Sequence, residues 1–197
     1  HIDDFQEIGL DLYVIGIGNE ASRDKFSDYT NIPRELVYYV NNDEIHRKLG
    51  ICNGRHLHIG VIPNLLLMCA GINSPGTLKE VIRGYLGDKE APRIFTDNEV
   101  IRICKFISFN SSSFCVFGPN DSLRPLELAT YRLRNMIEIF ENWKIYVPNM
   151  YYLCQRSGTF IFNENEELIY SYLSRSLLGY SETMRDPLTF IQRIVKT

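Results

Sequence analysis

The most informative segment of this chain reads Leu10-Asp11-Leu12-Tyr13-Val14-Ile15-Gly16-Ile17-Gly18. It is apolar apart from Asp11, and a near-continuous apolar run is typical of a strand whose two faces are both covered in a parallel sheet. The segment therefore predicts a central strand. We expect Val14 on one face and Ile15 on the other to be buried alike.

The residues around this strand predict alternating helices and strands. Before it, His1–Gly9 has the apolar spacing of the last turns of a helix that Gly9 ends. After it, Asn19 is a suitable N-cap for a helix through Tyr29. A second strand follows at Leu36–Val40, and then a short helix that Asn41 with Glu44 caps and Gly50 ends. This order favours parallel strands joined by right-handed crossovers.

The second half of the chain predicts several helices and one hairpin. The hairpin pairs two β-rich segments across the polar turn Asn163–Glu167. Thr77 with Glu80 caps an expected helix through Gly87, and Thr96 with Glu99 caps one that carries Val100, Ile103 and Phe106 on its apolar side. The other expected elements are a helix from Pro125 to near Trp143, hairpin strands Thr159–Phe162 and Leu168–Tyr172, and a helix after Asp186-Pro187.

This order of elements is that of the thioredoxin fold, and it predicts an α/β protein with a mixed sheet flanked by helices. We expect one thioredoxin-like domain over residues 1–197, with a helical insertion over about 73–150 before the C-terminal hairpin and helix. We expect Thr159–Phe162 to run antiparallel to the parallel pair.

Composition excludes several classes of protein. The chain has 197 residues, 45% of them hydrophobic, a net charge of -3 and a pI near 5.8. This charge argues against a nucleic-acid partner. The longest apolar run, Val61–Ile72, is shorter than the roughly 18 residues of a spanning helix, so we expect no transmembrane segment. We expect this run to be an interior strand or a buried loop, with an exposed docking patch as the alternative.

The five cysteines do not form a disulfide framework. Their number is odd, no two are spaced as C-x-x-C, and each lies in or beside an apolar stretch. We expect buried thiols that serve packing. They are Cys52, Cys69, Cys104, Cys115 and Cys154.

No motif predicts a metal or a cofactor. His56 and His58 form an H-x-H pair with His46 upstream, but no cysteine or carboxylate at matched spacing completes a zinc site. Gly16 and Gly18 precede a predicted helix without the third glycine of a dinucleotide-binding loop. We expect neither a metal site nor a bound cofactor.

Several longer motifs carry a family resemblance. The chain resembles the AhpC/TSA peroxiredoxin-like proteins, and specifically their cyanobacterial and plastid branch, over nearly its whole length. The residues that carry the resemblance are Gly16–Asn19, Leu36–Val40, His46–Ile51, Pro63–Ile72, Ser74–Val81, Arg83–Asp88, Arg124–Thr130 and Gln155–Phe162.

The resemblance implies a thioredoxin-like fold and places the reactive cysteine at the start of the first helix. That position would lie upstream of His1, so the resemblance implies that this chain lacks an N-terminal segment. It also implies that Arg156, just before a strand, corresponds to the arginine that faces the reactive sulfur. Cys154 lies two residues earlier, and a strand would place both side chains on one side. A packed thiol and a surface arginine are the simpler interpretations of these two candidates.

Two functional hypotheses follow from the resemblance. The preferred one is a peroxiredoxin-like plastid protein, stromal or peripheral on the thylakoid, that has lost peroxidase activity. It would act through protein partners as a subunit, connector or assembly factor of a photosynthetic membrane complex. The alternative is a thiol-dependent antioxidant enzyme, with its reactive cysteine upstream of His1 or with Cys154 recruited beside Arg156.

Overall fold

The computed structural model describes residues 2–53, 63, 76–116, 121–174, 185, 188, 189 and 191. The chain divides into two compact units. Unit 1 comprises His1–Ser74, Trp143–Gly179 and Asp186–Thr197, and unit 2 comprises Pro75–Asn142 and Tyr180–Arg185. The main segment of unit 2 falls within the predicted insertion over about 73–150. The single-domain organisation over 1–197 stays a prediction.

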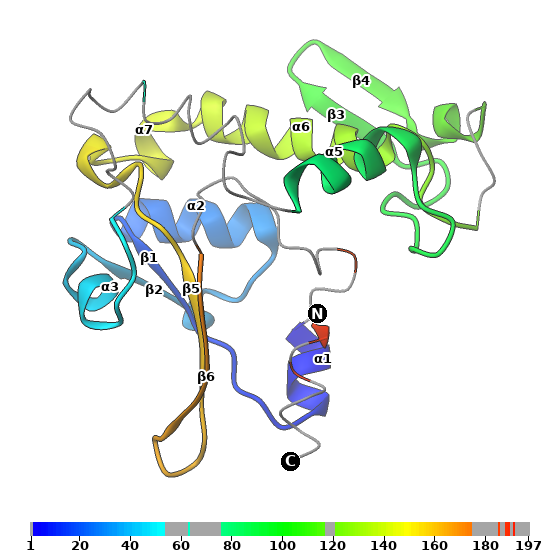
Figure 1. Cartoon of the computed structure of the whole chain (residues 1–197). Helices are drawn as coiled ribbons and strands as arrows, with labels where there is room; N and C mark the ends of the chain where they lie inside the picture. The colour runs from blue at the N-terminus through cyan, green and yellow to red at the C-terminus, as the bar shows by residue number, and fades with distance from the viewer. Residues whose placement is uncertain are drawn as a thin grey trace. The chain divides into compact units, whose positions relative to one another are not determined.

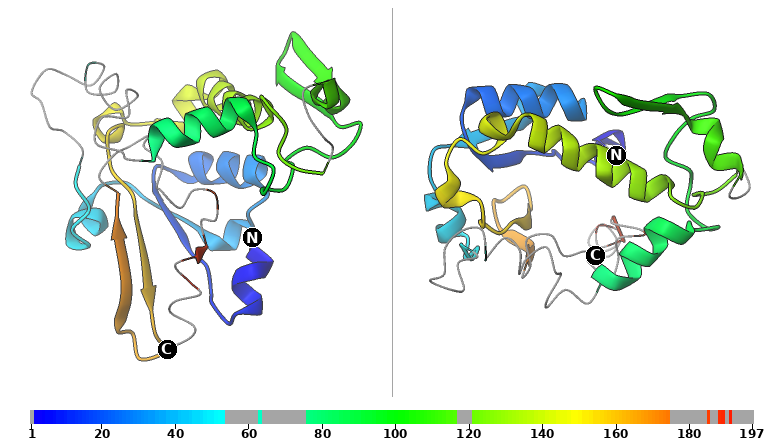
Figure 2. Two further views of the ribbon diagram at one scale, coloured as in Figure 1. Left: turned by 45° about the vertical axis from the view of Figure 1, so that its right-hand side comes forward. Right: turned by 90° about the horizontal axis from the view of Figure 1, so that it is seen from above.

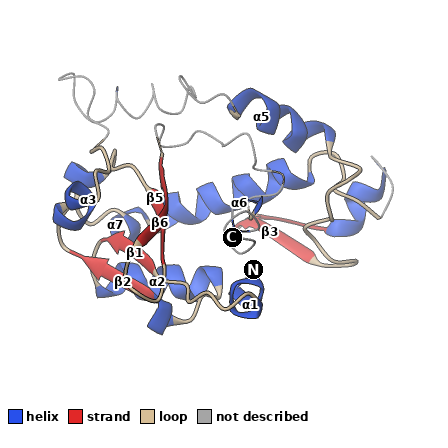
Figure 3. Cartoon of the chain, turned by 60° about the horizontal axis from the view of Figure 1, so that its bottom comes forward, coloured by secondary structure: helices blue, strands red, loops and turns tan. Residues whose placement is uncertain are grey.

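Unit 1 begins with the predicted alternation of helices and strands. Its elements are α1 (Ile2–Glu7), β1 (Val14–Ile17), α2 (Glu20–Thr30), η1 (Arg34–Leu36), β2 (Val37–Val40) and α3 (Glu44–Lys48). β1 and β2 pair in parallel, from Val14 opposite Val37 to Ile17 opposite Val40 (Figures 1 and 3). The prediction of a parallel pair is confirmed.

Local side-chain bonds explain where α2 begins. The Asn19 side chain accepts a hydrogen bond from the Ser22 backbone at 3.0 Å, and the Asn19 backbone donates back to the Ser22 hydroxyl. The predicted N-cap is therefore confirmed. The expected cap of α3 at Asn41 is wrong, because Asp43 holds the N-cap position and Asn42 accepts from the Glu44 backbone.

The two faces of the parallel pair differ in exposure. Val37 is buried and Val14 is half-buried, and α2 packs against β2. On the other face, Tyr13 is 58% exposed, Ile15 46% and Tyr38 51%. The expectation that both faces are buried is therefore wrong for this second face, which no described element covers.

The rest of unit 1 contains α7 (Trp143–Tyr146), η3 (Met150–Tyr152) and an antiparallel hairpin of β5 (Gly158–Phe162) and β6 (Leu168–Leu173). The hairpin is confirmed. Within the described residues, the strands form three two-stranded sheets, β1-β2, β3-β4 and β5-β6. The expectations that β1 is a central strand and that Thr159–Phe162 runs antiparallel to the parallel pair are therefore wrong for the described residues, because β5 pairs with β6 alone. Of the predicted C-terminal helix, only residues 188, 189 and 191 are described, and Ile191 is buried.

Unit 2 packs two helices against a hairpin. Its elements are α5 (Thr77–Leu86), β3 (Val100–Cys104), β4 (Ile107–Asn110), η2 (Ser111–Val116) and α6 (Glu127–Glu141). α5 and α6 run side by side (Figure 2). Their close approach suits Gly84, since a Cβ there would lie 3.6 Å from the Ala129 nitrogen.

The predicted helix from Thr96 through Phe106 is wrong. Glu99 does accept bonds from the Thr96 backbone and hydroxyl, as in a capping box, but these bonds close a turn. Ile101 and Ile103 then alternate with exposed neighbours in the strand period of two. The segment is a strand that pairs with β4, and the side chains of these two isoleucines face the core.

The densest core of the described chain lies in unit 2. Phe95, Ile101, Ile103 and Phe114 are each at most 8% exposed and form one cluster. Phe95 and Phe114 stack with ring centroids 6.1 Å apart. Helix α6 covers the cluster through Tyr131 and Ile137, which are part of its buried side. Unit 2 therefore holds its hairpin by apolar packing.

Candidate functional site

Arg156 lies between η3 and β5, in a segment tied to the loop after α3. Its backbone nitrogen donates to the Cys52 carbonyl oxygen at 3.1 Å. The side chain is 5% exposed, and within the described part of the chain its Nε and Nη1 have no hydrogen-bond partner. The interpretation of Arg156 as a surface arginine is therefore wrong, because the side chain is buried.

Cys154 lies in a turn, where the Gln155 backbone nitrogen donates to the Tyr152 carbonyl at 2.9 Å. The thiol is 2% exposed, as a packed cysteine should be. β5 begins only at Gly158, so the strand argument that placed Cys154 and Arg156 on one side is wrong. The two residues nevertheless share a short segment of unit 1.

The remaining cysteines differ in environment. Cys52 and Cys115 are exposed, so the expectation of burial is wrong for them, and Cys104 is half-buried at the end of β3. Cys115 accepts a hydrogen bond from Nη1 of buried Arg124 at 3.5 Å. No sequence pattern indicates that contact, because no regular element links the two residues. Cys69 lies outside the described residues.

A pocket of about 330 Å³ lies at the carboxyl ends of β1 and β2. Its walls are residues 17–19, Asn41, residues 146–149, Tyr152 and Leu153, all in unit 1. The weak Gly16-x-Gly18 motif thus leads into a real depression beside the first turn of α2. Asn19 and Asn149 are already engaged there, each accepting a bond from a nearby backbone nitrogen.

Unit 2 contains a buried ion pair that sequence reasoning did not identify. Arg124 and Glu127 are 1% and 0% exposed, and Nη2 of Arg124 lies 3.0 Å from Oε1 of Glu127. The same carboxylate accepts from the backbone nitrogens of Ile94 and Phe95. Burial raises the pKa of Glu127, but the bonds from Arg124 and the backbone outweigh it, so the pKa lies below its ordinary value.

A second buried carboxylate, Glu80, lies on α5. It was predicted to cap this helix with Thr77, but the helix has no side-chain cap, and Glu80 instead bonds Arg83 and Arg132 at 2.9 Å. Burial opposes ionisation, and the two arginines still hold the pKa of Glu80 below its usual range. Every carboxylate oxygen in these two clusters has a partner, which favours a structural role.

The predicted histidine pair, His56 and His58, lies outside the described residues. His46 is 9% exposed on α3, and burial, opposed by Asp43, lowers its pKa. No cluster of three or more His, Cys, Asp or Glu side chains within the described ranges has the arrangement of a metal site. No helix there is long and apolar enough to cross a membrane.

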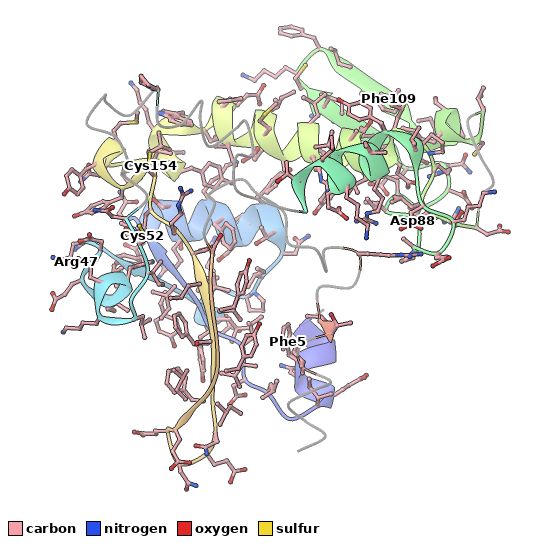
Figure 4. The ribbon with its side chains drawn as sticks, in the orientation of Figure 1. Phe5, Arg47, Cys52, Asp88, Phe109 and Cys154 are labelled. Atoms are coloured by element: carbon pink, nitrogen blue, oxygen red, sulfur yellow. The ribbon has the colours of Figure 1, made fainter. Side chains whose placement is uncertain are left out.

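Two further loops with exposed-type aromatic and apolar residues, Tyr151–Leu153 and Leu177–Tyr180, are candidate docking segments. In the first, Tyr151 is 52% exposed and its ring meets that of Tyr152 edge-on at 5.0 Å. The second, Leu177–Tyr180, and nearly all of Val61–Ile72 lie outside the described residues. Figure 4 shows the side chains of both units, with Asp88 and Phe109 in unit 2 and Cys52 and Cys154 in unit 1.

Comparison with known proteins identifies the family. The model of the AhpC/TSA antioxidant enzymes matches residues 1–176, which is most of the chain. No curated protein and no solved structure matches it. The matched region includes β1, β2, the β5-β6 hairpin and Arg156. The chain therefore belongs to the AhpC/TSA antioxidant enzyme family, and its mixed α/β architecture is the thioredoxin-like, peroxiredoxin-like fold of that family.

Proposed function

We propose that this peroxiredoxin-like protein has lost peroxidase activity and acts through protein contacts, as a subunit, connector or assembly factor of a thylakoid photosynthetic complex in the plastid. One observation carries the proposal. Among the described elements, none covers one face of the parallel pair, and this open sheet face (Tyr13, Ile15 and Tyr38) is about half exposed at each residue.

The open sheet face is unusual for its strand type. Parallel strands in α/β proteins are normally covered on both sides. Here Tyr13 and Tyr38 touch edge-on, with centroids 5.9 Å apart, and Ile15 pairs directly with Tyr38. Aromatic side chains are enriched at protein interfaces, because they bury much area at little cost in entropy. A protein partner covering this face supplies burial that the described elements of unit 1 do not.

The β5-β6 hairpin supports the same proposal. Apolar side chains on both of its sides are exposed, namely Phe162, Leu168, Ile169, Tyr172 and Leu173, each between 42% and 51%. An isolated two-stranded hairpin is marginally stable in water. Contact with a partner would bury these residues and stabilise the hairpin.

The positions of the four described cysteines also favour a non-catalytic role. A reactive thiolate needs a helix N-terminus or a nearby cation. Cys52 follows the end of α3, Cys104 ends β3, and Cys154 occupies a turn with a nearly inaccessible thiol. Cys115 has Arg124 as a neighbour, but Glu127 already neutralises that arginine. The plastid and thylakoid assignment is supported only by the motif resemblance.

The test uses the full native protein in gently solubilised thylakoid membranes. We expect it to co-migrate with a photosynthetic complex on native electrophoresis. Ile15→Asp should release it, because the substitution places a charge on the open sheet face. Glu35→Gln, an exposed polar change in the same unit, should leave co-migration unchanged. Migration as a free monomer in all three cases would remove the proposal.

A second candidate function is thiol-dependent reduction of hydroperoxides. It is favoured by Arg156, whose buried guanidinium has two nitrogens without a partner among the described residues. In the family, the arginine before this strand faces the reactive sulfur. The test measures hydroperoxide consumption by the full native protein with a dithiol reductant. Activity that is lost in Arg156→Met and kept in the exposed control Arg102→Met would replace the first proposal with this one.

A further inference from the structure

We propose that helix α5 lies on an anionic lipid surface, with one side of the helix in the boundary between the headgroups and the acyl chains. The inference goes beyond the proposed function and does not depend on it. α5 belongs to unit 2 and its partner is lipid, whereas the proposed function rests on a protein partner for the open sheet face of unit 1.

Helix α5 turns its polar side inward and its apolar side outward. On the inward side, Glu80 is 3% exposed and accepts hydrogen bonds from Arg83 and Arg132 at 2.9 Å, and buried Gly84 approaches α6. The outward side is an apolar arc of about 140° around the helix axis. The members of the apolar arc are Leu78 (71% exposed), Val81 (39%), Ile82 (47%), Tyr85 (57%) and Leu86 (71%). An amphipathic helix normally buries its apolar stripe, so this side of α5 is suited to an apolar partner.

The chemistry of the apolar arc fits hydrocarbon better than a protein surface. A protein interface carries about one hydrogen bond per 100–200 Å², but the five side chains of the arc offer one polar group, the hydroxyl of Tyr85. Hydrocarbon makes no hydrogen bonds, and tyrosine beside leucine and isoleucine is typical of helices that lie at a membrane interface. α5 has ten residues, about half the length of a spanning helix, so it would lie in the plane of the surface.

The charges beside the apolar arc complement an anionic headgroup. Lys79 is exposed at the edge of the arc, and Lys89 is exposed just beyond the end of the helix. Neither lysine has an ion-pair partner among the described residues, whereas the carboxylates of Asp88 and Glu90 are both paired with Arg185. The outward charge next to α5 is therefore positive, although the net charge of the chain is -3. Lysine stems can lie along apolar surface while their ammonium groups contact the headgroups.

The experiment measures sedimentation of the full native protein with vesicles of phosphatidylglycerol and phosphatidylcholine in equal parts. We expect the protein to sediment with the vesicles, and Ile82→Asp to lower the bound fraction about fivefold, because it places a carboxylate within the apolar arc. Phe106→Asp is the matched control, since it makes the same change of charge at a side chain that is 94% exposed between β3 and β4. It should leave binding unchanged. Circular dichroism checks that both variants are folded.

A double variant tests the role of charge. Lys79→Gln combined with Lys89→Gln should lower the affinity for these vesicles about tenfold, because basic residues near the surface attract anionic lipid. The vesicles contain no protein, so the result is independent of the photosynthetic complex in the proposed function. Wild-type protein that does not sediment, equal losses in Ile82→Asp and Phe106→Asp, or full binding by the double variant would overturn the proposal. A dimer in solution that Ile82→Asp separates into monomers would also overturn it, and would assign the apolar arc to a second copy of the chain.

Discussion

The largest stability effect that we expect from one residue is at Glu127. Glu127→Ala would leave the buried Arg124 guanidinium and several backbone nitrogens without their acceptor. Breaking a buried pair in this way costs about 3–5 kcal/mol of unfolding free energy. Glu141→Ala, an exposed change on the same helix, should alter it by less than about 0.5 kcal/mol. Urea unfolding measures both, and equal effects would contradict the assignment of Glu127 to the core of unit 2.

The buried pair of Arg124 and Glu127 also predicts that the unfolding free energy depends on pH. Folding lowers the pKa of Glu127, so its contribution to stability is complete above the unfolded value of about 4.3 and is lost as pH falls through the lower folded value. We expect the stability difference between wild type and Glu127→Gln to be constant from pH 7 to 5 and to shrink below about pH 4. A difference that does not change down to pH 3 would show that the carboxylate is not ionised in the folded protein.

Arg156 predicts a gain in stability on substitution. A buried charge with unpartnered nitrogens is costly, so Arg156→Met should keep or raise the unfolding free energy, by about 1 kcal/mol or more. Arg156→Lys keeps the charge and should give no gain. If Arg156→Met instead loses about 2 kcal/mol in urea unfolding, then the guanidinium has a stabilising partner in the folded protein.

Among the elements, β3 is the one where the exposure of side chains distinguishes a strand from the predicted helix. The helical pattern had placed Phe106 on the buried face, whereas Phe106 is 94% exposed and Ile101 is 0% exposed. Ile101→Ala should therefore cost about 2–5 kcal/mol, and Phe106→Ala less than about 0.5 kcal/mol. Chemical denaturation of the two variants checks this order, and the reverse order would restore the helix.

The end of α5 depends on a glycine. Gly87 has φ +79°, and a Cβ there would lie 2.5 Å from the Leu123 carbonyl oxygen. Gly9 has φ +74° with no atom within 4 Å of its Cβ position. Gly9→Ala should therefore cost about 1 kcal/mol, from the backbone alone, and Gly87→Ala about 2 kcal/mol more, from the added clash. Equal losses on thermal unfolding would mean that the loop at Leu123 moves away freely.

These elements show what the sequence can predict and what it cannot. Asn19 and Ser22 lie three residues apart, so the start of α2 follows from local chemistry. The segment from Thr96 carries a capping pair that is equally local. Its structure is decided instead by pairing with β4 and by packing of Ile101 and Ile103 in a cluster with Phe95 and Phe114, and a capping pattern does not report these contacts. Local patterns therefore predicted the start of α2, placed the caps of α3 and α5 wrongly, and misassigned a strand that packing selects.

At the scale of the whole molecule, the family and the order of elements were predictable from the sequence. Which apolar side chains are exposed was not. The apolar residues of β1 indicated burial on both faces, yet only the Val14 face is covered within the described residues. Sequence pattern reports which side chains prefer burial, but it does not say whether this chain or a partner buries them. The candidate site shows the same limit, because spacing could not reveal that Cys52 adjoins Arg156.

The central claim is that a protein partner covers the open sheet face, and the most direct test is the reactivity of a cysteine placed there. Ile15→Cys in the full protein should react quickly with a maleimide in isolation, and at least tenfold more slowly in gently solubilised thylakoid membranes. Glu35→Cys should react equally in both, with labelled sites identified by mass spectrometry. Equal reactivity of Ile15→Cys in the isolated protein and in the membranes would contradict the account.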